Sequence, residues 1–501
     1  MEISQLLERS KQRQVQIIYL LLERNGSATI KEIAEHLNAY RNTIKEDIEC
    51  LQLVFSTFNH QVELENNDGV ITLETFGKIS NLEVFYYFVE NSTYYQILMW
   101  LLDYGRFDIQ SLAMKLTISE ATLSRRIKGL NELLAEFDLK IKNGILVGSE
   151  LQIRYFYFLL LWFGRPYHVN QENIIDKSSI DLIQILEESL GFPFTEDGKI
   201  KLKIWLVVTK KRLVLFSNEE ATEEFTAKEY RFSDNLFKEL YRVLSLFYSQ
   251  FAYNWDYSEA VMFYLFLLSN FTLVKDNPLT HEFITEVTRK NYPVAEMNAE
   301  VLKLIREIAD TSKFSAAFRF KTITTLFRFH YRIYYFKGNF TFLGASGLDH
   351  LRDDLPDERL VDVSEVIVKR VLELANIPES DRAYTGFFLE DYYLSLIYLA
   401  YRDLEFKLKV GCDFPFERDT ADVFIDYLAN RLDPRLKVDM LPYEEGQKYD
   451  LIVTNIQKNY PGMLPDQVYI LFSVEYSYDV PGLEDFLGQH YHDIIQQRVI
   501  K

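Results

Sequence analysis

The sequence predicts a mainly α-helical, multidomain protein. It would contain tandem winged helix-turn-helix units, two helical-bundle domains and a small C-terminal α/β domain with a parallel sheet. Three observations support this fold class. The pattern of residues 30–51 recurs without a gap at 109–130, in the first third of the chain. Residues 150–400 have helical periodicity with few strand signals, and beyond about residue 404 expected strands alternate with expected helices.

The composition limits the class of protein. The chain has 501 residues, of which 48% are apolar and 15% aromatic, so several domains with sizeable cores are expected. Two cysteines, Cys50 and Cys412, exclude a disulfide framework and a cysteine-based zinc cluster. Residues 1–16 are charged and polar, and the longest apolar runs are too short to span a bilayer. We therefore expect a soluble, cytoplasmic protein without a membrane partner.

Charge is distributed unevenly along the chain. The net charge of −19 counts against indiscriminate binding to nucleic acid. Residues 1–165 contain 17 Lys and Arg against 21 Asp and Glu, a net of −4, so −15 of the total lies in residues 166–501. The acid is concentrated in the later domains, as expected if DNA binds near the front of the chain.

The repeated segments have the helix-turn-helix pattern. Residues 30–37 and 109–116 each precede a short turn and a second helix, and a small alanine in each lets two helices cross closely. The second helix buries residues at helical spacing and leaves its outer face free to enter a major groove. The matching pairs, all at the same offset, are Ala34 and Ala113, Leu37 and Leu116, Thr43 and Thr122, Ile44 and Leu123, Ile48 and Ile127, and Leu51 and Leu130.

A hairpin signal follows each copy. Residues 62–73 alternate apolar and polar side chains around Asp68-Gly69, and residues 139–147 do so around Asn143-Gly144. Asp-Gly and Asn-Gly between alternating apolar residues are strong signals of a two-residue turn. A helix-turn-helix followed by a hairpin is a winged helix, which the sequence therefore predicts twice. The alternative is a helical protein with two unrelated hairpins.

The two expected recognition helices differ in charge. The first offers Arg41, Asn42 and Lys45, of which Arg41 and Lys45 share one face. Acid close to DNA phosphates is unfavourable, and this helix and its wing also carry Glu46, Asp47, Glu49, Glu63, Glu65 and Asp68.

The second recognition helix is expected from about residue 120 to residue 137. Its candidate DNA-binding residues, with those of its wing, are Thr122, Ser124, Arg125, Arg126, Lys128, Lys140 and Lys142. We expect this unit to supply most phosphate contacts, and Arg125 or Arg126 to read guanine. The alternative is that these are ordinary solvated surface charges.

The middle of the chain contains a second, looser duplication. Residues 205–212 are similar to 330–337, and residues 259–267 are similar to 390–398. Two related helical domains would then meet near residues 276–278. In the tail, residues 406–410, 438–441, 449–454 and 468–472 are expected strands, and residues 419–432 and 481–499 are expected helices.

This order of parts resembles the Mga/AtxA-type virulence transcription regulators of Gram-positive bacteria. The helical pair is similar to phosphotransferase-system regulation domains (PRD), and the tail is similar to an enzyme IIB component, best matched at residues 449–454. The resemblance covers nearly the whole chain. It implies a dimeric or larger DNA-binding regulator that links sugar uptake to virulence or adaptation genes. The expected domains are winged units at 1–75 and 76–165, helical domains at 166–283 and 284–402, and an enzyme IIB-like domain at 403–501.

The resemblance also implies phosphorylation of histidines in the helical domains. A phosphorylated imidazole gains negative charge and can reset a domain interface. The matching position of the first domain is Trp205, and the second domain offers His330 as the best candidate. We favour the alternative that His330 is a partly buried structural histidine. His281 and His350 are weaker candidates.

An enzyme IIB domain normally carries a phosphorylatable cysteine in the loop after its first strand. Cys412 follows the expected strand at 406–410. The next loop, residues 413–418, lacks the glycines and serine whose amides would cradle a phosphate, and its acids would repel one. We therefore interpret Cys412 as structural and the tail as an assembly domain.

The sequence contains no pattern that argues for catalysis, a cofactor or a metal. Walker and dinucleotide-binding patterns are missing from it, and His490 and His492 would point away from each other on a helix. We therefore predict a sequence-specific transcription regulator, not an enzyme, and the resemblance favours an activator. Its partners would be double-stranded promoter DNA, further copies of itself and phosphotransferase proteins. The alternative is a phosphotransfer relay or scaffold whose winged units bind proteins, which the acidity of the first unit favours.

Overall fold

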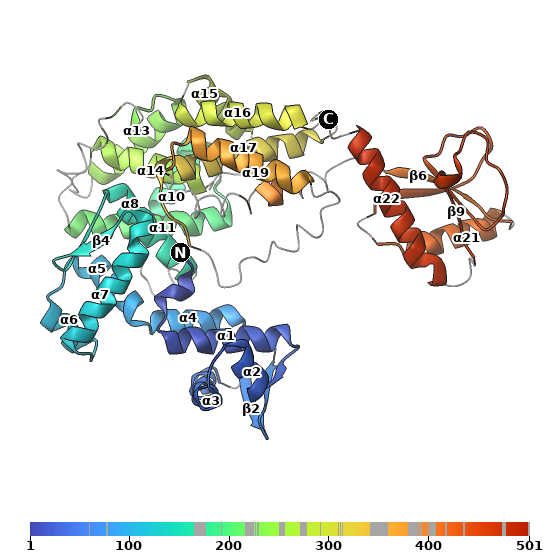
Figure 1. The fold of residues 1–501 in the computed structure, drawn as a ribbon. Coiled ribbons are helices and arrows are strands. Elements are labelled where there is room, and N and C mark those ends of the chain that lie inside the picture. The colour runs from blue at the N-terminus through green and yellow to red at the C-terminus, as the bar shows by residue number, and fades with distance from the viewer. Residues whose placement is uncertain are drawn as a thin grey trace. The chain divides into compact units, whose positions relative to one another are not determined.

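The computed structural model shows a mainly helical chain whose strands gather in small sheets (Figure 1). The chain divides into two compact units. One contains Met1–Asn298, Thr324–Gly347 and Ala375–Phe388, and the other contains Ala299–Ile323, Leu348–Leu374 and Leu389–Lys501. The residues that the structure describes are 1–59, 61–76, 79–164, 177–191, 193–215, 225, 227, 230–249, 256–270, 278–290, 292–308, 310, 312, 314–340, 359–378, 390, 393–397, 399, 407–415, 418–433, 436–472 and 477–498.

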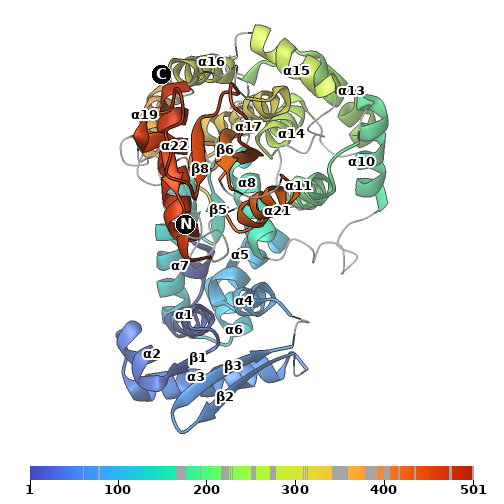
Figure 2. The ribbon, with the colours of Figure 1, turned by 90° about the vertical axis from the view of Figure 1, so that its right-hand side faces the viewer.

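The first winged unit joins three helices to a three-stranded antiparallel sheet of order β1-β3-β2 (Figure 2). Its core is formed where the second and third helices cross, and Ile44 and Leu51 there are fully buried. Asp68 and Gly69 have φ angles of 52° and 85° and close the predicted hairpin. The elements are α1 (Arg9–Glu23), β1 (Ser27–Thr29), α2 (Ile30–His36), α3 (Arg41–Ser56), β2 (Val62–Asn67) and β3 (Val70–Thr75).

The second winged unit has the same helix-turn-helix followed by a hairpin, but its sheet has two strands where the sheet of the first unit has three. A 3-10 turn, η2 (Ala135–Phe137), lies between its recognition helix and a short hairpin, and Asn143 and Gly144 close that hairpin with φ angles of 53° and 73°. The other elements are α4 (Asn81–Glu90), α5 (Thr93–Tyr104), α6 (Ile109–Lys115), α7 (Glu120–Leu134), β4 (Lys140–Lys142) and β5 (Ile145–Val147).

The constant offset of the sequence repeat holds in the backbone as well. The offset that joins Ala34 to Ala113 also joins both ends of α2 to those of α6, and the start of α3 to the start of α7. Left-handed backbone conformations, which L-residues rarely adopt, recur at the same offset. They occur at Gly26 and Gly105, at Asn38 and Thr117, and at Asn59 and Asp138. The helix-turn-helix parts of the two winged units are thus copies of one structure, as the sequence predicts.

Side-chain caps fix where the helices of both units begin. The hydroxyl of Thr29 accepts a hydrogen bond from the backbone N–H of Glu32, and the Glu32 carboxylate accepts one from the N–H of Thr29. In the second copy Asp108 caps α6 and Ser119 caps α7 through the N–H groups three positions further on. These caps satisfy N–H groups that the helix itself leaves without partners.

The helices that follow the winged units within the first compact unit form a helical body, and a buried ion network joins three of them. The Arg154 guanidinium donates to Glu259 at 2.7 and 2.8 Å and to Glu150 at 2.8 Å, and Arg212 donates to Glu150 at 2.6 Å. Burying charges is tolerated because each one has an opposite partner. The helices of the first unit are α8 (Glu150–Gly164), α10 (Lys177–Leu190), α11 (Glu196–Leu215), α13 (Asn235–Ser249), α14 (Tyr257–Asn270) and α15 (Pro278–Arg289). The chain then passes between the two units within α16 (Pro293–Ile308) and α17 (Ala316–Tyr335), and α19 (Arg359–Leu374) belongs to the second unit.

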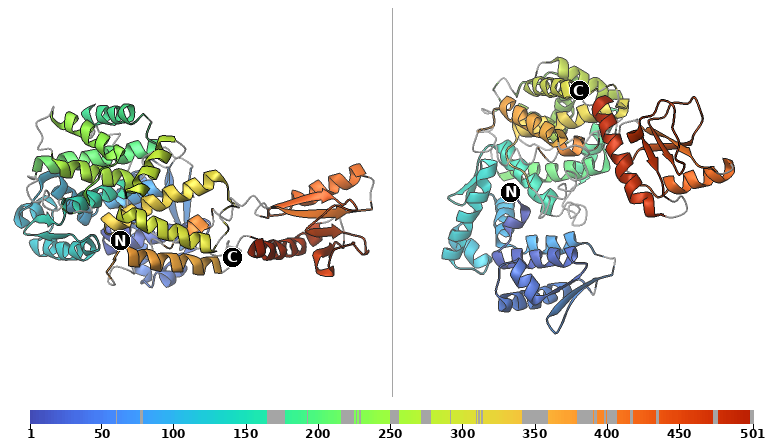
Figure 3. Two further views of the ribbon diagram at one scale, coloured as in Figure 1. Left: turned by 90° about the horizontal axis from the view of Figure 1, so that it is seen from above. Right: turned by 45° about the vertical axis from the view of Figure 1, so that its right-hand side comes forward.

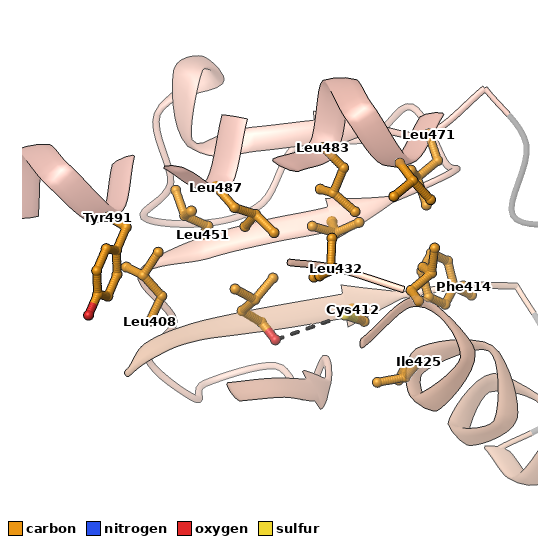
Figure 4. Packing of buried hydrophobic residues seen from close by; sticks show 14 residues of the cluster. Leu408, Cys412, Phe414, Ile425, Leu432, Leu451, Leu471, Leu483, Leu487 and Tyr491 are labelled. Carbon is orange, nitrogen blue, oxygen red and sulfur yellow. Dashed lines mark hydrogen bonds between the residues drawn. The ribbon is translucent and has the colours of Figure 1, made fainter. Parts of the chain in front are cut away.

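The tail is a small α/β domain, as predicted. Its four strands form a fully parallel sheet of order β7-β6-β8-β9. Figure 3 shows this sheet with the helices of the tail in two further views. Side chains of α21 and α22 pack with those of the central strands in one apolar cluster, which includes Leu408, Leu451 and Leu487 (Figure 4). The elements are β6 (Leu408–Asp413), α21 (Arg418–Ala429), β7 (Val438–Pro442), β8 (Leu451–Thr454), β9 (Val468–Ile470) and α22 (Val480–Arg498).

The position of Cys412 differs from the prediction. We expected Cys412 in a loop after a strand ending at residue 410, but β6 continues to Asp413. Cys412 pairs in register with Pro442 on one side and Val453 on the other. The strand is longer because buried residues continue along it and both neighbouring strands supply hydrogen-bonding partners.

Candidate nucleic-acid interface

The outward face of α7 presents cations without an intervening carboxylate. Leu123, Leu130 and Leu134 are fully or almost fully buried and fix which face of the helix looks inward. Ser124, Arg125 and Lys128 are exposed on the other side. Residues 121–131 contain no acid, and the exposed Glu120 and Glu132 mark the two ends of this stretch. This stretch is therefore chemically suited to the anionic surface of a duplex.

Arg125 and Arg126 are in different environments, although the sequence treats them as equal candidates. The guanidinium of Arg126 lies 5.4 Å from the ring centre of Tyr94 on α5, and its side chain is half-buried. Arg125 is exposed and donates a long hydrogen bond of 3.3 Å to the hydroxyl of Thr122. A cation over an aromatic face is held to the protein body. Arg125 is thus the more accessible of the two.

Thr122 and the capping Ser119 form the polar entrance to α7. Their hydroxyl oxygens lie 2.9 Å apart, and the Ser119 hydroxyl also accepts from the N–H of Thr122 at 3.2 Å. The candidate Thr122 is half-buried and already bonded within the helix. Its immediate effect is to shape the first turn and to orient Arg125.

The wing of the second unit adds two cations. Ile141 and Leu146 are buried, whereas the alternating Lys140 and Lys142 are exposed on the opposite face of the hairpin. A Cβ at Gly144 would lie 2.1 Å from the carbonyl oxygen of Phe107, so only glycine fits this turn. The tip of the wing that carries Lys140 and Lys142 is therefore closely packed against Phe107.

A side chain that the sequence analysis missed ties the wing to the recognition helix. The amide of Asn131, on α7, accepts from the N–H of Ile141 at 2.6 Å and donates to the Ile141 carbonyl at 3.1 Å. In the first unit Gln52, on α3, donates to the carbonyl of Leu64 at 2.9 Å. Gln52 and Asn131 occupy the same position of the repeat, so extending the repeat to polar positions would have found them.

The first recognition helix also exposes its predicted residues. Arg41, Asn42 and Lys45 are all exposed on α3. Acid shares this surface, because Glu46 and Glu49 are exposed as well.

Asp47 was counted with the opposing acids of the first unit, and this was wrong. Asp47 is 3% exposed and accepts hydrogen bonds from Arg13 and Gln14 on α1. Its charge is neutralised inside the protein by Arg13, so it faces the core of the unit and not a duplex. In the wing, Glu65 and Asp68 are exposed and Glu63 is half-buried.

The histidine and cysteine candidates lie away from these surfaces. His330 is fully buried on α17, its Nδ1 is hydrogen-bonded to Asn298, and burial lowers the pKa of the imidazole to about 3. His281 is exposed on α15. Cys412 is buried, and burial raises the pKa of its thiol to about 12. His350 lies outside the described residues, and Trp205 is buried and stacked on Phe266 at 4.3 Å.

Two further properties concern the described part of the chain as a whole. It places no group of three or more His, Cys, Asp or Glu side chains where they could hold a metal ion. None of its helices combines the length and the apolar character that crossing a membrane requires.

Comparisons with known proteins agree with this geometry. Residues 8–66 match the helix-turn-helix domain of the M protein trans-acting positive regulator (MGA), and residues 77–161 match the Mga helix-turn-helix domain. The two winged units are therefore helix-turn-helix domains of the Mga type, as the resemblance predicted.

Two curated relatives are similar over part of the chain. One is a protein of Streptococcus pneumoniae serotype 4, provisionally named a trans-acting regulator, which is 25% identical over 215 residues covering 42% of each chain. Another is the capsule synthesis positive regulator AcpB of Bacillus anthracis, 25% identical over 211 residues covering 41% of this chain and 43% of AcpB. The similarity thus spans less than half of the length of these curated relatives.

Proposed function

We propose that this chain, with its two Mga-type helix-turn-helix domains, is a sequence-specific DNA-binding transcription regulator that activates its target genes. The observation that carries the proposal is the outward face of α7, where Arg125 and Lys128 stand exposed without a carboxylate between them. Lys140 and Lys142, on the wing that follows α7, are exposed as well. Activation is proposed because AcpB is named a positive regulator.

The second unit divides the work of recognition between helix and wing. Arg125, at the exposed start of α7, reads guanine through the two acceptors on its major-groove edge. Lys128 and the wing lysines contact phosphates, which position the protein without reading the sequence. Arg126 supports α7 from its place over Tyr94.

The first unit attracts the DNA phosphates less strongly than the second and contributes more to discrimination between base sequences. Asn42 is exposed at the start of α3 and fits the donor and acceptor pattern of adenine. Arg41 and Lys45 contact phosphates, while Glu46 and Glu49 oppose close approach of the backbone. Because the phosphates attract this unit only weakly, its binding to DNA depends on hydrogen bonds to the correct bases.

We further propose a cytoplasmic homodimer or larger homo-oligomer that responds to the sugar phosphotransferase system. His281 is an exposed candidate on α15. His330 is fully buried, so its imidazole meets a phosphoryl donor only if α17 first exposes it. Incubation with the general phosphotransferase proteins and labelled phosphoenolpyruvate, followed by peptide mapping, tests this layer. Label on the peptide containing His281 supports it, and an unlabelled protein removes it.

DNA binding itself is tested by a gel shift with promoter-length duplexes in the presence of excess competitor DNA. We expect the protein to keep shifting its duplex at competitor concentrations that abolish non-specific binding. In a separate footprinting experiment, the protected region should be long enough for two winged units. A protein that shifts no duplex but retains phosphotransferase proteins would overturn the proposal in favour of a relay or scaffold.

A further inference from the structure

A short segment after α17 contacts the second winged unit at the turn between its recognition helix and its wing. We call residues 336–340 the strap. It leaves the end of α17 and lies against η2, the short turn that joins recognition helix α7 to wing strand β4. Both the strap and the winged unit belong to the same compact unit of the chain. Nothing in the sequence indicates this contact, because residues 336–340 and 135–137 are far apart along the chain.

Hydrogen bonds join the strap to α8 and to η2. The Gln152 side chain on α8 donates to the carbonyl of Lys337 at 2.6 Å and accepts from its N–H at 3.0 Å. The N–H of Asn339 donates to the carboxylate of Glu136 at 3.2 Å, within η2. The ammonium of Lys337 lies 2.7 Å from the carboxylate of Asp138, the first residue after η2. This last pair is exposed and contributes little by itself.

Aromatic packing makes the contact specific. Phe137, at the end of η2, is fully buried, and its ring lies 5.4 Å from Phe340 and 5.1 Å from Phe156 on α8. The strap turns at Gly338, which has a φ of 74°. A Cβ at Gly338 would lie 2.6 Å from the Phe137 ring, so the strap approaches η2 as closely as a backbone can.

The first winged unit has a different arrangement at the matching position. Phe58, the counterpart of Phe137 in the repeat, is half-buried, and its ring contacts Tyr87 of the neighbouring α4 at 5.8 Å. Phe137 instead packs against residues that come from the helical body. The link between helical body and recognition elements is therefore built at the second copy.

We propose that the strap is the positioning element of the second wing, through which the end of α17 sets the DNA affinity of that unit. The inference rests on the proposed DNA binding for its functional part. The structural part of the inference does not depend on DNA binding. The strap holds η2, and η2 sets the direction in which β4, with Lys140 and Lys142, continues from α7. Displacing α17 or the strap loosens the wing and lowers affinity for the duplex.

Two variants of the full chain test the strap, with a matched control. Gly338→Ala forces a Cβ against Phe137, and Gln152→Ala removes both hydrogen bonds to Lys337. Gly446→Ala in the tail is the control, since Gly446 has a φ of 92° and open space around its Cβ position. Hydrogen exchange of the peptide covering residues 138–147 reports on the wing without any DNA. Fluorescence anisotropy with a labelled duplex reports on affinity.

We expect the wing amides to exchange about tenfold faster in both strap variants, and their duplex Kd to rise about tenfold, with Gly446→Ala unchanged. Wild-type exchange at the wing in both variants, with circular dichroism showing folded protein, would overturn the strap. If Gly338→Ala does not fold, Gln152→Ala decides the question alone. If the wild type binds no duplex, the proposed function is wrong, but the hydrogen-exchange result still tests the strap.

Discussion

The side chain of Asn131 holds both backbone groups of Ile141, accepting from its N–H at 2.6 Å and donating to its carbonyl at 3.1 Å. This pair of bonds joins the recognition helix α7 to the first strand of the wing. The same helix position in the first unit, Gln52, reaches the carbonyl of Leu64. A duplicated module has thus kept the helix-to-wing contact with a side chain one methylene shorter.

Replacing Asn131 with alanine is expected to lower the free energy of unfolding by about 1–3 kcal/mol, because two hydrogen bonds are lost at a partly buried backbone. Urea denaturation of the full chain measures this. Gln52→Ala is the matched variant, with one bond lost, and should cost about 0.5–1.5 kcal/mol. An Asn131→Ala midpoint equal to that of the wild type would contradict the role of this contact.

Thr117 provides a test of backbone strain. It is a β-branched residue with a φ of 56°, in the turn between α6 and α7, where the first unit has Asn38 with a φ of 46°. Asparagine tolerates this conformation better than threonine. Thr117→Asn should therefore raise the free energy of unfolding by on the order of 1 kcal/mol, and Asn38→Thr should lower it by a similar amount. Thermal denaturation measures both changes. If the two substitutions shifted the melting temperature in the same direction, the explanation by backbone strain would be refuted.

Arg126 and Arg125 should separate stability from binding. Arg126→Ala removes the contact with Tyr94 and should cost about 0.5–1 kcal/mol of stability. Arg125→Ala should leave stability within about 0.5 kcal/mol of the wild type, since its side chain is exposed, and should weaken duplex binding more. Paired denaturation and anisotropy measurements decide this. A larger loss of affinity from Arg126→Ala would reverse the assignment of the guanine-reading residue.

The buried His330 predicts an acid sensitivity. Burial lowers the pKa of its imidazole from 6.5 to about 3, so the folded state keeps it neutral while the unfolded state binds a proton below pH 6.5. Stability is therefore lost as the pH falls from 6.5 towards 3, by up to about 1.4 kcal/mol per pH unit from this group. Urea midpoints of the wild type and His330→Gln, compared from neutral to mildly acidic pH, measure it. Equal slopes for the two proteins would exclude the effect.

The local parts of the fold are the parts that the sequence predicts well. Asp68-Gly69 and Asn143-Gly144 identify both wings because a two-residue turn needs positive φ angles at these positions. The repeat places both recognition helices, since it carries the buried pairs such as Ile44 and Leu123. The parallel tail follows from alternating strands and helices.

Contacts between distant segments are the parts that the sequence does not predict. Asp47 is read as a surface acid because Arg13, its partner, lies on another helix. The equal treatment of Arg125 and Arg126 fails because Tyr94 lies on α5. The strap on η2 carries no local signal at all. Each of these depends on tertiary packing, which periodicity and turn chemistry do not encode.

The salt dependence of duplex binding tests the central claim most directly. We compare the wild type with Arg125→Ala/Lys128→Ala, and with Lys407→Ala/Lys448→Ala, which removes two exposed cations from the tail. The α7 variant should bind at least about tenfold more weakly, and the slope of log K against log salt should fall by about 1–2. The tail variant should match the wild type. An α7 variant with wild-type affinity and slope would contradict the assignment of this face to DNA.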